Sequence, residues 1–464
     1  MQKVYHEVNQ LDRHCYEAFG LTEDILMENA ARAISDAIVQ NFAKNKNLLI
    51  VSGVGNNGAD GIVVARHLHG DFNVSLCLPF GAKSPMCMLQ LQRAKLLGLT
   101  VVEKIEDNYD IVVDALFGTG LNKPLDNRAL EVIEQMNALS GFKIACDIAS
   151  GIDSEGEVER VAFEAHKTIT MGALKKSLFS DKAKEYVGDI EVAHLGVARG
   201  FYEAYDTSIF LLEKSDIRLP HRRKANKHKG NYGHVHVIVG EQEGAGIMAA
   251  MSAFRFGSGL VSVVSSIKPA NLPLYLMHSH SIGSHCSALA LGMGLGDFDL
   301  SKILELDIPM VVDADMFYKD EIKQLLKKEQ ILLTPHPKEF VSLLKLCNIA
   351  GISVKQLQSN RFKYSELFSQ HYPHVVLVLK GANVLIAHQA KIYINPHGSS
   401  VLAKGGSGDV LAGLIASLLS QGYTPLDAAL NASLAHAIAS RQYSKNSYAM
   451  TPLELIETIA RLKI

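Results

Sequence analysis

Residues 403–419 read AKGGSGDVLAGLIASLL, a glycine-rich turn that runs directly into a long apolar segment. This pattern predicts a phosphate-type turn at the start of a buried helix. The backbone N–H groups of Gly406, Ser407 and Gly408 would form an anion hole, and Asp409 would face the same point. A carboxylate base beside an anion hole suits phosphoryl transfer to a hydroxyl group. Helix capping alone is the structural alternative.

Short β-branched runs alternate with longer amphipathic segments along the whole chain, which predicts an α/β fold with parallel sheets covered by helices. The expected strands are 47–53, 110–114, 143–147, 234–240, 310–313 and 375–380. Their apolar residues do not alternate strictly with polar ones, as is typical of strands buried on both faces of a doubly wound sheet.

A chain of 464 residues is too long for one compact core, so we expect two domains. The segment 215–233, SDIRLPHRRKANKHKGNYG, is basic, contains a proline and lacks an apolar period. We therefore place the junction between domains 1–214 and 215–464. Most of the basic charge there is expected to be solvated linker charge, although its end could bind a nucleotide phosphate.

Composition favours small-molecule chemistry. The formal charge is −2 and the pI is about 6.8, which gives no field to attract nucleic acid or an acidic membrane surface. The six cysteines are scattered, without a Cys-x-x-Cys pair, which argues against a disulfide framework or a zinc knuckle. No signal-peptide core or membrane-spanning apolar run is present, so we expect a cytoplasmic protein.

A second glycine-rich segment lies near the N-terminus. We expect a strand over 48–52, a tight loop at VGNNGAD (54–60) and the start of a helix over 61–68, which together would aim N–H groups at an anion. Gly53, Gly55 and Gly58 would give the backbone room to approach a ligand. A plain tight turn is the alternative.

Two further predicted strands end in polar groups, Asp114 in IVVDALFGTGL and Asp147, Ser150 and Asp153 in KIACDIASGID. Ligands gather at the carboxyl ends of parallel strands, so these groups should face the same crevice as the NNGAD loop. A single Asp at such a position is more often a cap or a turn former. Oxygen ligands of this kind would suit a hard cation.

The strings GVGNNGADGIVVARHL, DALFGTGL and DIASGID resemble the signature blocks of the NAD(P)H-hydrate epimerase domain, and LMENAARAI resembles its first helix. The resemblance covers residues 5–205 and implies a Rossmann-like three-layer domain. It implies contacts to the hydrated cofactor at Asn56, Asn57, Gly58, Ala59, Asp60, Gly118, Thr119, Gly120, Leu121, Asn122, Lys123, Pro124 and Asp147. It implies K⁺ ligands at Asn57, Asp114 and Ser150. Ala59 stands where the family usually has Gly, and Ala149 where it usually has Pro.

The hydrate carries a hydroxyl on the carbon beside the ring nitrogen, and inverting that centre needs an acid or base. Asp147 is the candidate to exchange the proton, with a K⁺-ordered loop fixing the pose of the substrate. This is a hypothesis from its position at a strand end together with the resemblance.

The C-terminal half carries the G-x-G-D element typical of ribokinase-like kinases. In addition, KHKGNYGHVHVIVG, LGMGLGD, VVDAD, LTPHPKEF and LKGANVLI occur in the order found in the ADP- or ATP-dependent NAD(P)H-hydrate dehydratase domain, which this half resembles from residue 227 onward. The resemblance implies a ribokinase-like α/β/α domain. It implies hydrate contacts at Ala245, Gly294, His336 and Asp409, and nucleotide contacts at Lys380, Gly381, Ala382, Asn383, Val384 and Gly408. We expect Mg²⁺ near Asp313 or Asp315, although MFY replaces the family's usual Leu-Asn after this pair.

Together the resemblances imply a bifunctional repair enzyme: an isomerase that interconverts the R and S hydrates of NADH and NADPH, and a lyase that dehydrates the S hydrate. Asp409 would deprotonate the ring hydroxyl, the nucleotide's terminal phosphoryl group would move to that oxygen, and phosphate would then leave. ADP is the expected donor, with ATP possible, and a homo-oligomer larger than a dimer is expected. Two alternatives stay open: a ribokinase-type kinase that releases a stable phosphoester, and an N-terminal half that only binds nucleotide or protein.

Overall fold

The computed structural model describes residues 1–120 and 124–463. It divides into two compact units: Lys3–Thr207, called the N-terminal unit below, and Ser208–Ile464 with Met1–Gln2, called the C-terminal unit. The junction expected between residues 214 and 215 lies inside the second unit. The reason is that residues 209–211 already pair with a strand of the C-terminal sheet.

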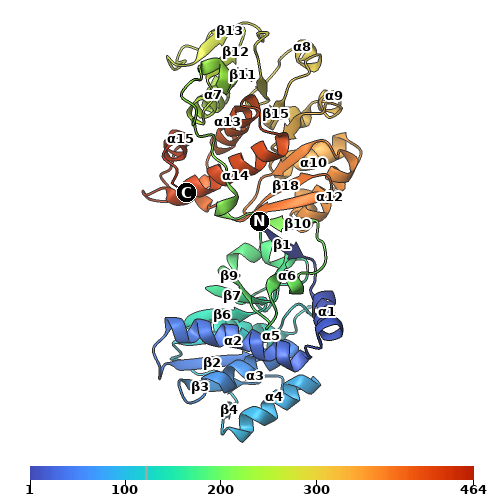
Figure 1. The fold of residues 1–464 in the computed structure, drawn as a ribbon, viewed down its shortest axis with the longest axis vertical. Helices are drawn as coiled ribbons and strands as arrows, with labels where there is room; N and C mark the ends of the chain where they lie inside the picture. The colour runs from blue at the N-terminus through green and yellow to red at the C-terminus, as the bar shows by residue number, and fades with distance from the viewer. Residues whose placement is uncertain (121–123, 464) are drawn as a thin grey trace. The chain divides into compact units, whose positions relative to one another are not determined.

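The N-terminal unit is a Rossmann-like α/β fold (Figure 1). Its strands are β1 (Gln2–Tyr5), β2 (Asn47–Ser52), β3 (Asn73–Cys77), β4 (Val101–Val102), β5 (Ile111–Ala115), β6 (Phe142–Cys146), β7 (Lys167–Met171), β8 (Leu174–Lys175) and β9 (Asp189–Ala193). Its helices are α1 (Asn9–Phe19), α2 (Glu23–Asn41), α3 (Asn56–Leu68), α4 (Pro85–Leu96), α5 (Asn127–Ala138) and α6 (Arg199–Tyr202). No helix in the described residues of either unit is long and apolar enough to cross a membrane.

The main sheet of this unit has seven strands in the order β4-β3-β2-β5-β6-β7-β9, and every neighbouring pair is parallel. Leu48 and Ile50 of β2 share an apolar cluster with α2, α3 and α4. Leu49 and Val51 are equally buried and point to the opposite face. Both faces of the sheet are therefore covered, as the unbroken apolar runs predicted.

The C-terminal unit is an α/β fold built on one mixed sheet. Its strands are β10 (Ile209–Leu211), β11 (His234–Ile238), β12 (Leu260–Val264), β13 (Met277–Ser279), β14 (Ala288–Leu291), β15 (Met310–Val312), β16 (Ile331–Leu333), β17 (Val376–Leu379), β18 (Val384–His388) and β19 (Lys391–Asn395). Its helices are α7 (Glu243–Arg255), α8 (Ser301–Leu304), α9 (Ile322–Leu325), α10 (Pro337–Leu346), α11 (Val354–Gln358), α12 (Arg361–His371), α13 (Ser407–Ser420), α14 (Pro425–Gln442) and α15 (Pro452–Ala460).

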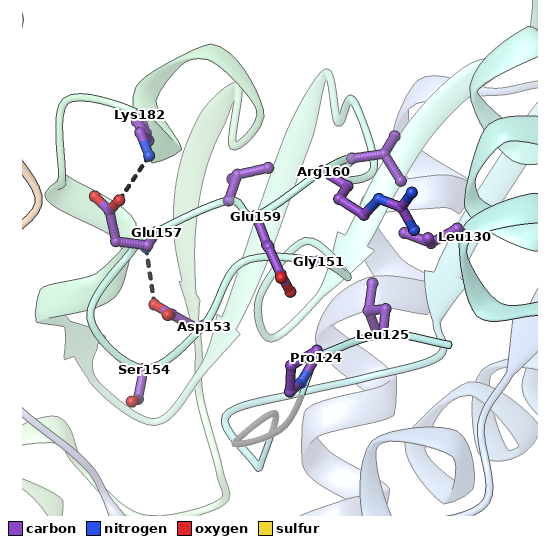
Figure 2. Close-up of a pocket in the computed structure, with 12 residues that line it drawn as sticks. Pro124, Leu125, Leu130, Gly151, Asp153, Ser154, Glu157, Glu159, Arg160 and Lys182 are labelled. Carbon is purple, nitrogen blue, oxygen red and sulfur yellow. Dashed lines mark hydrogen bonds and ion pairs between the residues drawn. The ribbon is translucent and has the colours of Figure 1, made fainter. Parts of the chain in front are cut away.

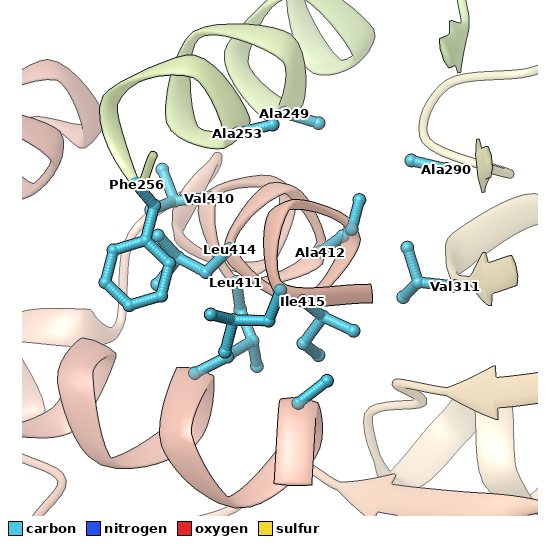
Figure 3. Close-up of a cluster of buried hydrophobic side chains, with 14 of the residues drawn as sticks. Ala249, Ala253, Phe256, Ala290, Val311, Val410, Leu411, Ala412, Leu414 and Ile415 are labelled. Atoms are coloured by element: carbon cyan, nitrogen blue, oxygen red, sulfur yellow. The ribbon is translucent and has the colours of Figure 1, made fainter. Parts of the chain in front are cut away.

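Its sheet runs in the order β13-β12-β11-β14-β15-β16-β17-β18-β19-β10. Pairing is parallel from β13 to β17 and antiparallel over β17, β18 and β19. Helix α13 is buried against this sheet and against α7, where small residues allow close contact (Figure 3). A Cβ on Gly413 would lie 2.1 Å from the carbonyl oxygen of Ala249, so this crossing requires glycine. The apolar sequence of 410–419 is thus explained by burial on all sides.

The predicted α/β fold class and all six predicted strands are confirmed, with small differences at the strand ends. One local prediction was wrong. The segment 54–60 is not a loop that precedes a helix at residue 61, because α3 already begins at Asn56 and includes NNGAD in its first turns. The N–H of Ala59 donates to the carbonyl oxygen of Gly55 at 3.0 Å, which closes the first turn.

Candidate active sites

Four parallel strands of the N-terminal sheet, β2, β5, β6 and β7, end at one edge, and polar groups follow or close each of them. Asp114 is the penultimate residue of β5, and Asp147 directly follows β6. Helix α3 starts beyond β2 at the same edge. The close approach of α3 to the end of β2 depends on Gly58, where a Cβ would lie 1.9 Å from the carbonyl oxygen of Gly53. The convergence expected from the sequence is therefore present.

Asp114 and Ser150 form one buried hydrogen-bonded group. The N–H of Ser150 donates to Asp114 Oδ2 at 2.7 Å, and its hydroxyl donates to Asp114 Oδ1 at 2.7 Å. The N–H of Leu116 also donates to Oδ1, at 3.1 Å. Burial raises the pKa of Asp114 to about 6, while the hydrogen bonds from Ser150 and Leu116 act in the opposite direction.

The side chain of Asn57 ends in a buried amide whose oxygen and nitrogen have no hydrogen-bond partner in the described residues. A Cβ on Gly118 would lie 3.3 to 3.4 Å from this side chain, so the loop after β5 closes over it. An orphaned amide oxygen near carboxylate and hydroxyl oxygens is the donor set of a hard monovalent or divalent cation. The expected K⁺ ligands Asn57, Asp114 and Ser150 therefore fit such an ion in kind. A site made of charged or His and Cys ligands alone is not found: among residues 1–120 and 124–463, no group of three or more His, Cys, Asp or Glu side chains could hold a metal ion.

Asp147 is held by a buried lysine that the sequence analysis did not single out. Lys175 is 1% exposed, and its Nζ lies 2.6 Å from Asp147 Oδ1, 2.9 Å from Thr170 Oγ1 and 3.1 Å from the carbonyl oxygen of Met171. The N–H of Met171 donates to the same Oδ1 at 3.0 Å. Every hydrogen bond to this carboxylate from the described residues ends on Oδ1, so Oδ2 is left for a ligand. The backbone of Asp147 has φ 70°, a conformation that Asp tolerates better than most residues.

The loop 118–124 is only partly described: Leu121, Asn122 and Lys123 lie outside the described residues. Gly118, Thr119, Gly120 and Pro124 flank them. Pro124 lines a pocket of about 530 Å³ together with Gly151, Arg160 and Lys182 (Figure 2). Its lining includes neither Asp60 nor Asp147, so this pocket lies beside the acid–base groups and does not contain them.

The two departures from the family pattern are accommodated. Ala59 is fully buried inside α3 and is not among the residues with positive φ, so it introduces no strain in place of glycine. Ala149 is fully buried directly before Ser150.

Of the three N–H groups expected to form an anion hole in the C-terminal unit, one already has a partner. Gly406 caps α13 with φ 91°, a conformation that favours glycine. The N–H of Ser407 donates to the carbonyl oxygen of Lys404 at 3.3 Å, so it is already used. The N–H groups of Gly406 and Gly408 have no partner in the described residues, which leaves two of the three expected donors for an anion.

Asp409 lies in a cluster of charged side chains. Burial and the negative charge of Asp313 raise its pKa to about 7, while Lys380 acts in the opposite direction. Lys380 Nζ lies 2.9 Å from Asp313 Oδ1 and 3.9 Å from Glu339 Oε2. Burial also raises the pKa of Glu339 to about 7. A Cβ on Gly408 would lie 3.3 Å from Lys380 Nζ, so the glycine turn, the lysine and Asp313 meet at one place.

The other residues expected to contact the hydrate, His336, Ala245 and Gly294, form hydrogen bonds within the protein. His336 caps α10, since its Nδ1 accepts from the N–H groups of Lys338 and Glu339 at 3.1 and 3.2 Å, and its side chain is 45% exposed. Ala245 lies in the first turn of α7, and its N–H donates to the carbonyl oxygen of Gln242 at 3.1 Å. The N–H of Gln242 in turn donates to the carbonyl oxygen of Gly294, so Ala245 and Gly294 both hydrogen-bond to Gln242.

Buried Arg361 supports the expected nucleotide segment 380–384. Its guanidinium donates to the carbonyl oxygens of Leu379, Lys380 and Asn383 at 3.1, 3.1 and 2.9 Å. His436 similarly lies 2.9 Å from the carbonyl oxygen of Ser407, and burial lowers its pKa to about 4. Neither residue belongs to a recognisable motif, and only the three-dimensional contacts identify them, as for Lys175.

The two units thus define a class of protein: α/β enzymes of two units, each with acid–base groups where the strands of its sheet end. Comparison with known proteins narrows this class. The family model described as YjeF-related protein N-terminus matches residues 23–177, and the model described as NAD(P)H-hydrate dehydratase matches residues 235–461.

Curated relatives match the whole chain. The bifunctional NAD(P)H-hydrate repair enzyme Nnr of Helicobacter pylori is 51% identical over 100% of both chains, and that of Coxiella burnetii is 33% identical over 94% of this chain and 93% of its own. A solved ADP/ATP-dependent NAD(P)H-hydrate dehydratase from Bacillus subtilis is 27% identical over 52% of this chain and 92% of its own, with a TM-score of 0.44. The chain belongs to the family of bifunctional NAD(P)H-hydrate repair enzymes.

Proposed function

We propose that this protein repairs hydrated NADH and NADPH. The N-terminal unit interconverts the R and S hydrates, and the C-terminal unit dehydrates the S hydrate with phosphoryl transfer from ADP, or from ATP. The observation that supports this most is the pairing of two acid–base sites in one chain whose full length matches relatives with this name.

In the N-terminal unit, Asp147 takes and returns the proton through Oδ2, while Lys175 holds Oδ1. The groups proposed to contact the hydrate are Asn56, Asn57, Gly58, Ala59, Asp60, Gly118, Thr119, Gly120, Leu121, Asn122, Lys123, Pro124 and Asp147. An ion bound at Asn57, Asp114 and Ser150 supplies positive charge that fixes the loop after β5. These side chains orient the substrate against Asp147.

In the C-terminal unit, Asp409 removes the proton from the ring hydroxyl, and a pKa near 7 suits a general base at neutral pH. The hydroxyl oxygen attacks the terminal phosphorus of the nucleotide, and the free N–H groups of Gly406 and Gly408 stabilise the transferred group. Phosphate then leaves with the oxygen while the lone pair of the ring nitrogen forms a C=N bond, and loss of a proton from the neighbouring ring carbon converts this to the C=C bond of NADH. Asp313 or Asp315 would hold the Mg²⁺ that accompanies the nucleotide. Arg361 positions the segment 380–384.

Replacing Asn57 by alanine should shift the K⁺ dependence of epimerisation to higher KCl concentrations. Loss of one of three ligands should weaken K⁺ binding by about tenfold or more. We would measure exchange of the separated R hydrate against rising KCl at constant ionic strength, with dehydration by the same sample as the internal control. Unchanged K⁺ dependence in the variant would exclude Asn57 as a ligand.

The rate of dehydration should rise with pH through about 7 and then level off, because Asp409 must be a carboxylate to act as the base. On the acid side, each pH unit should lower kcat/KM by about tenfold, as for one ionisation. A profile of kcat/KM that stays flat through pH 7, measured with nucleotide saturating and the hydrate below its KM, would show that another group removes the proton.

The direct test uses the separated S hydrate with ADP or ATP. Formation of NADH with one phosphate released per NADH supports dehydration and identifies the donor, whereas a stable phosphoester would support a kinase. We further propose a homo-oligomer in the cytoplasm, which light scattering and fractionation would check.

A further inference from the structure

Asp60 is a buried carboxyl group without a partner. It lies in the second turn of α3 with 9% of its surface exposed. In residues 1–120 and 124–463, no group donates a hydrogen bond to its carboxyl oxygens and no cation forms an ion pair with it. Burying an unpaired charge is costly, so this environment favours the neutral acid.

Asp147 lies in the opposite environment. Its carboxylate pairs with the ammonium of Lys175 at 2.6 Å and accepts a hydrogen bond from the N–H of Met171 at 3.0 Å. Two carboxyl groups with such different surroundings, one buried without a partner and one paired with a cation, are the arrangement that separates an acid from a base.

The charges around Asp60 act in the same direction as its burial. Burial, then the negative charge of Asp147, raises its pKa well above the usual value, and only Lys175 opposes this. The titratable groups that face it are Asp12 of α1, Glu23 of α2, Cys146 and Asp147 at the end of β6, and Lys175 of β8. Asp12 is already engaged, because the hydroxyl of Tyr202 donates to its Oδ1 at 2.7 Å.

We propose that Asp60 is a second catalytic residue of the N-terminal site, the acid that protonates the hydroxyl of the hydrate while Asp147 acts as the base. The proposal rests on the proposed epimerase function and goes beyond substrate contact by the NNGAD segment. Lys175 decides which of the two carboxyl groups carries the charge.

The step balances without an oxidant or a further reactant. Asp60 gives its proton to the hydroxyl oxygen, the C–O bond breaks, and water leaves while the lone pair of the ring nitrogen forms a C=N bond. A water molecule then adds to the other face of that carbon, its proton passes to Asp147 Oδ2, and the C=N electrons return to nitrogen. The resulting state, ionised Asp60 and protonated Asp147, is the one that the reverse inversion requires.

Asp60→Asn tests the proposal, with Asp110→Asn as the matched control. Asp110 directly precedes β5, at the opposite end of that strand from Asp114, and pairs with Lys46 at 2.9 Å. We would follow inversion of the separated R hydrate without nucleotide. Asp60→Asn should lower kcat by about a hundredfold or more, Asp60→Glu should recover part of it, and Asp110→Asn should match the parent. The parental rate should fall on the alkaline side as Asp60 loses its proton.

Three results would overturn the proposal while leaving the epimerase function intact: a parental kcat in Asp60→Asn, a rise in KM alone, or inversion in oxygen-18 water without label in the product. If the parent protein does not invert the hydrate, the proposed epimerase function itself is wrong. This outcome is distinct from the three results above, which concern Asp60 alone. Circular dichroism and limited proteolysis of each variant show whether the N-terminal unit is folded, and Asp60→Glu provides the comparison if Asp60→Asn is not.

Discussion

Asp409→Ala should abolish dehydration of the S hydrate while exchange between the two epimers continues at the parental rate. The carboxylate is the proposed base, and losing a general base lowers the rate by about two to four orders of magnitude. The epimer exchange should persist because its groups all belong to the N-terminal unit. NADH absorbance and chromatography of both epimers, recorded on one sample, would measure the two activities.

The matched control is Asp320→Ala, which removes an exposed carboxylate of the same unit that pairs only with nearby Lys323 at 2.7 Å. It should keep both activities. If Asp409→Ala lost both activities in a folded protein, the assignment of one reaction to each unit would be wrong. Dehydration at the parental rate would exclude Asp409 as the base.

Asp147→Asn should stop epimer exchange and leave dehydration of the separated S hydrate unchanged. The expected loss is again about two to four orders of magnitude, because an amide cannot accept the proton. The variant also leaves the ammonium of Lys175 buried without its counter-ion, which costs about 3–5 kcal/mol of stability.

The double variant Asp147→Asn with Lys175→Met separates chemistry from stability. Removing both charges should restore part of the melting temperature of the N-terminal unit but none of the exchange. If the double variant exchanged the epimers at the parental rate, neither residue would be needed for the chemistry. Exchange at the parental rate in Asp147→Asn alone would exclude this carboxylate as the proton acceptor.

The sequence predicts the fold class well because its strands are short apolar runs at regular intervals. Residues 234–240 and 310–313 are recognisable without any structure, and both became strands. The start of α3 was not predicted because NNGAD combines turn-forming residues with a glycine, Gly58. In the structure the segment is helical, because Gly58 lets the first turn of the helix pack against Gly53.

Site residues could be predicted where they belong to a sequence motif or stand at a strand end. Single residues outside any motif, which contact the site only in the folded protein, could not be predicted. Asp114 and Asp147 stand at strand ends, so parallel pairing brings them together. Lys175 is one lysine among many, and nothing near it in the sequence indicates that it is buried on Asp147. Arg361 belongs to the same group, because its role comes from contacts with a segment that follows it by about twenty residues.

The most direct test of the whole account is to incubate the purified protein with a mixture of both NADH hydrate epimers, Mg²⁺ and ADP or ATP. We expect complete conversion of both epimers to NADH, with one phosphate released per NADH, whereas Asp147→Asn should rapidly convert only the S fraction. If no NADH forms with either nucleotide, or if a stable phosphorylated product accumulates, the repair function proposed for this chain is wrong.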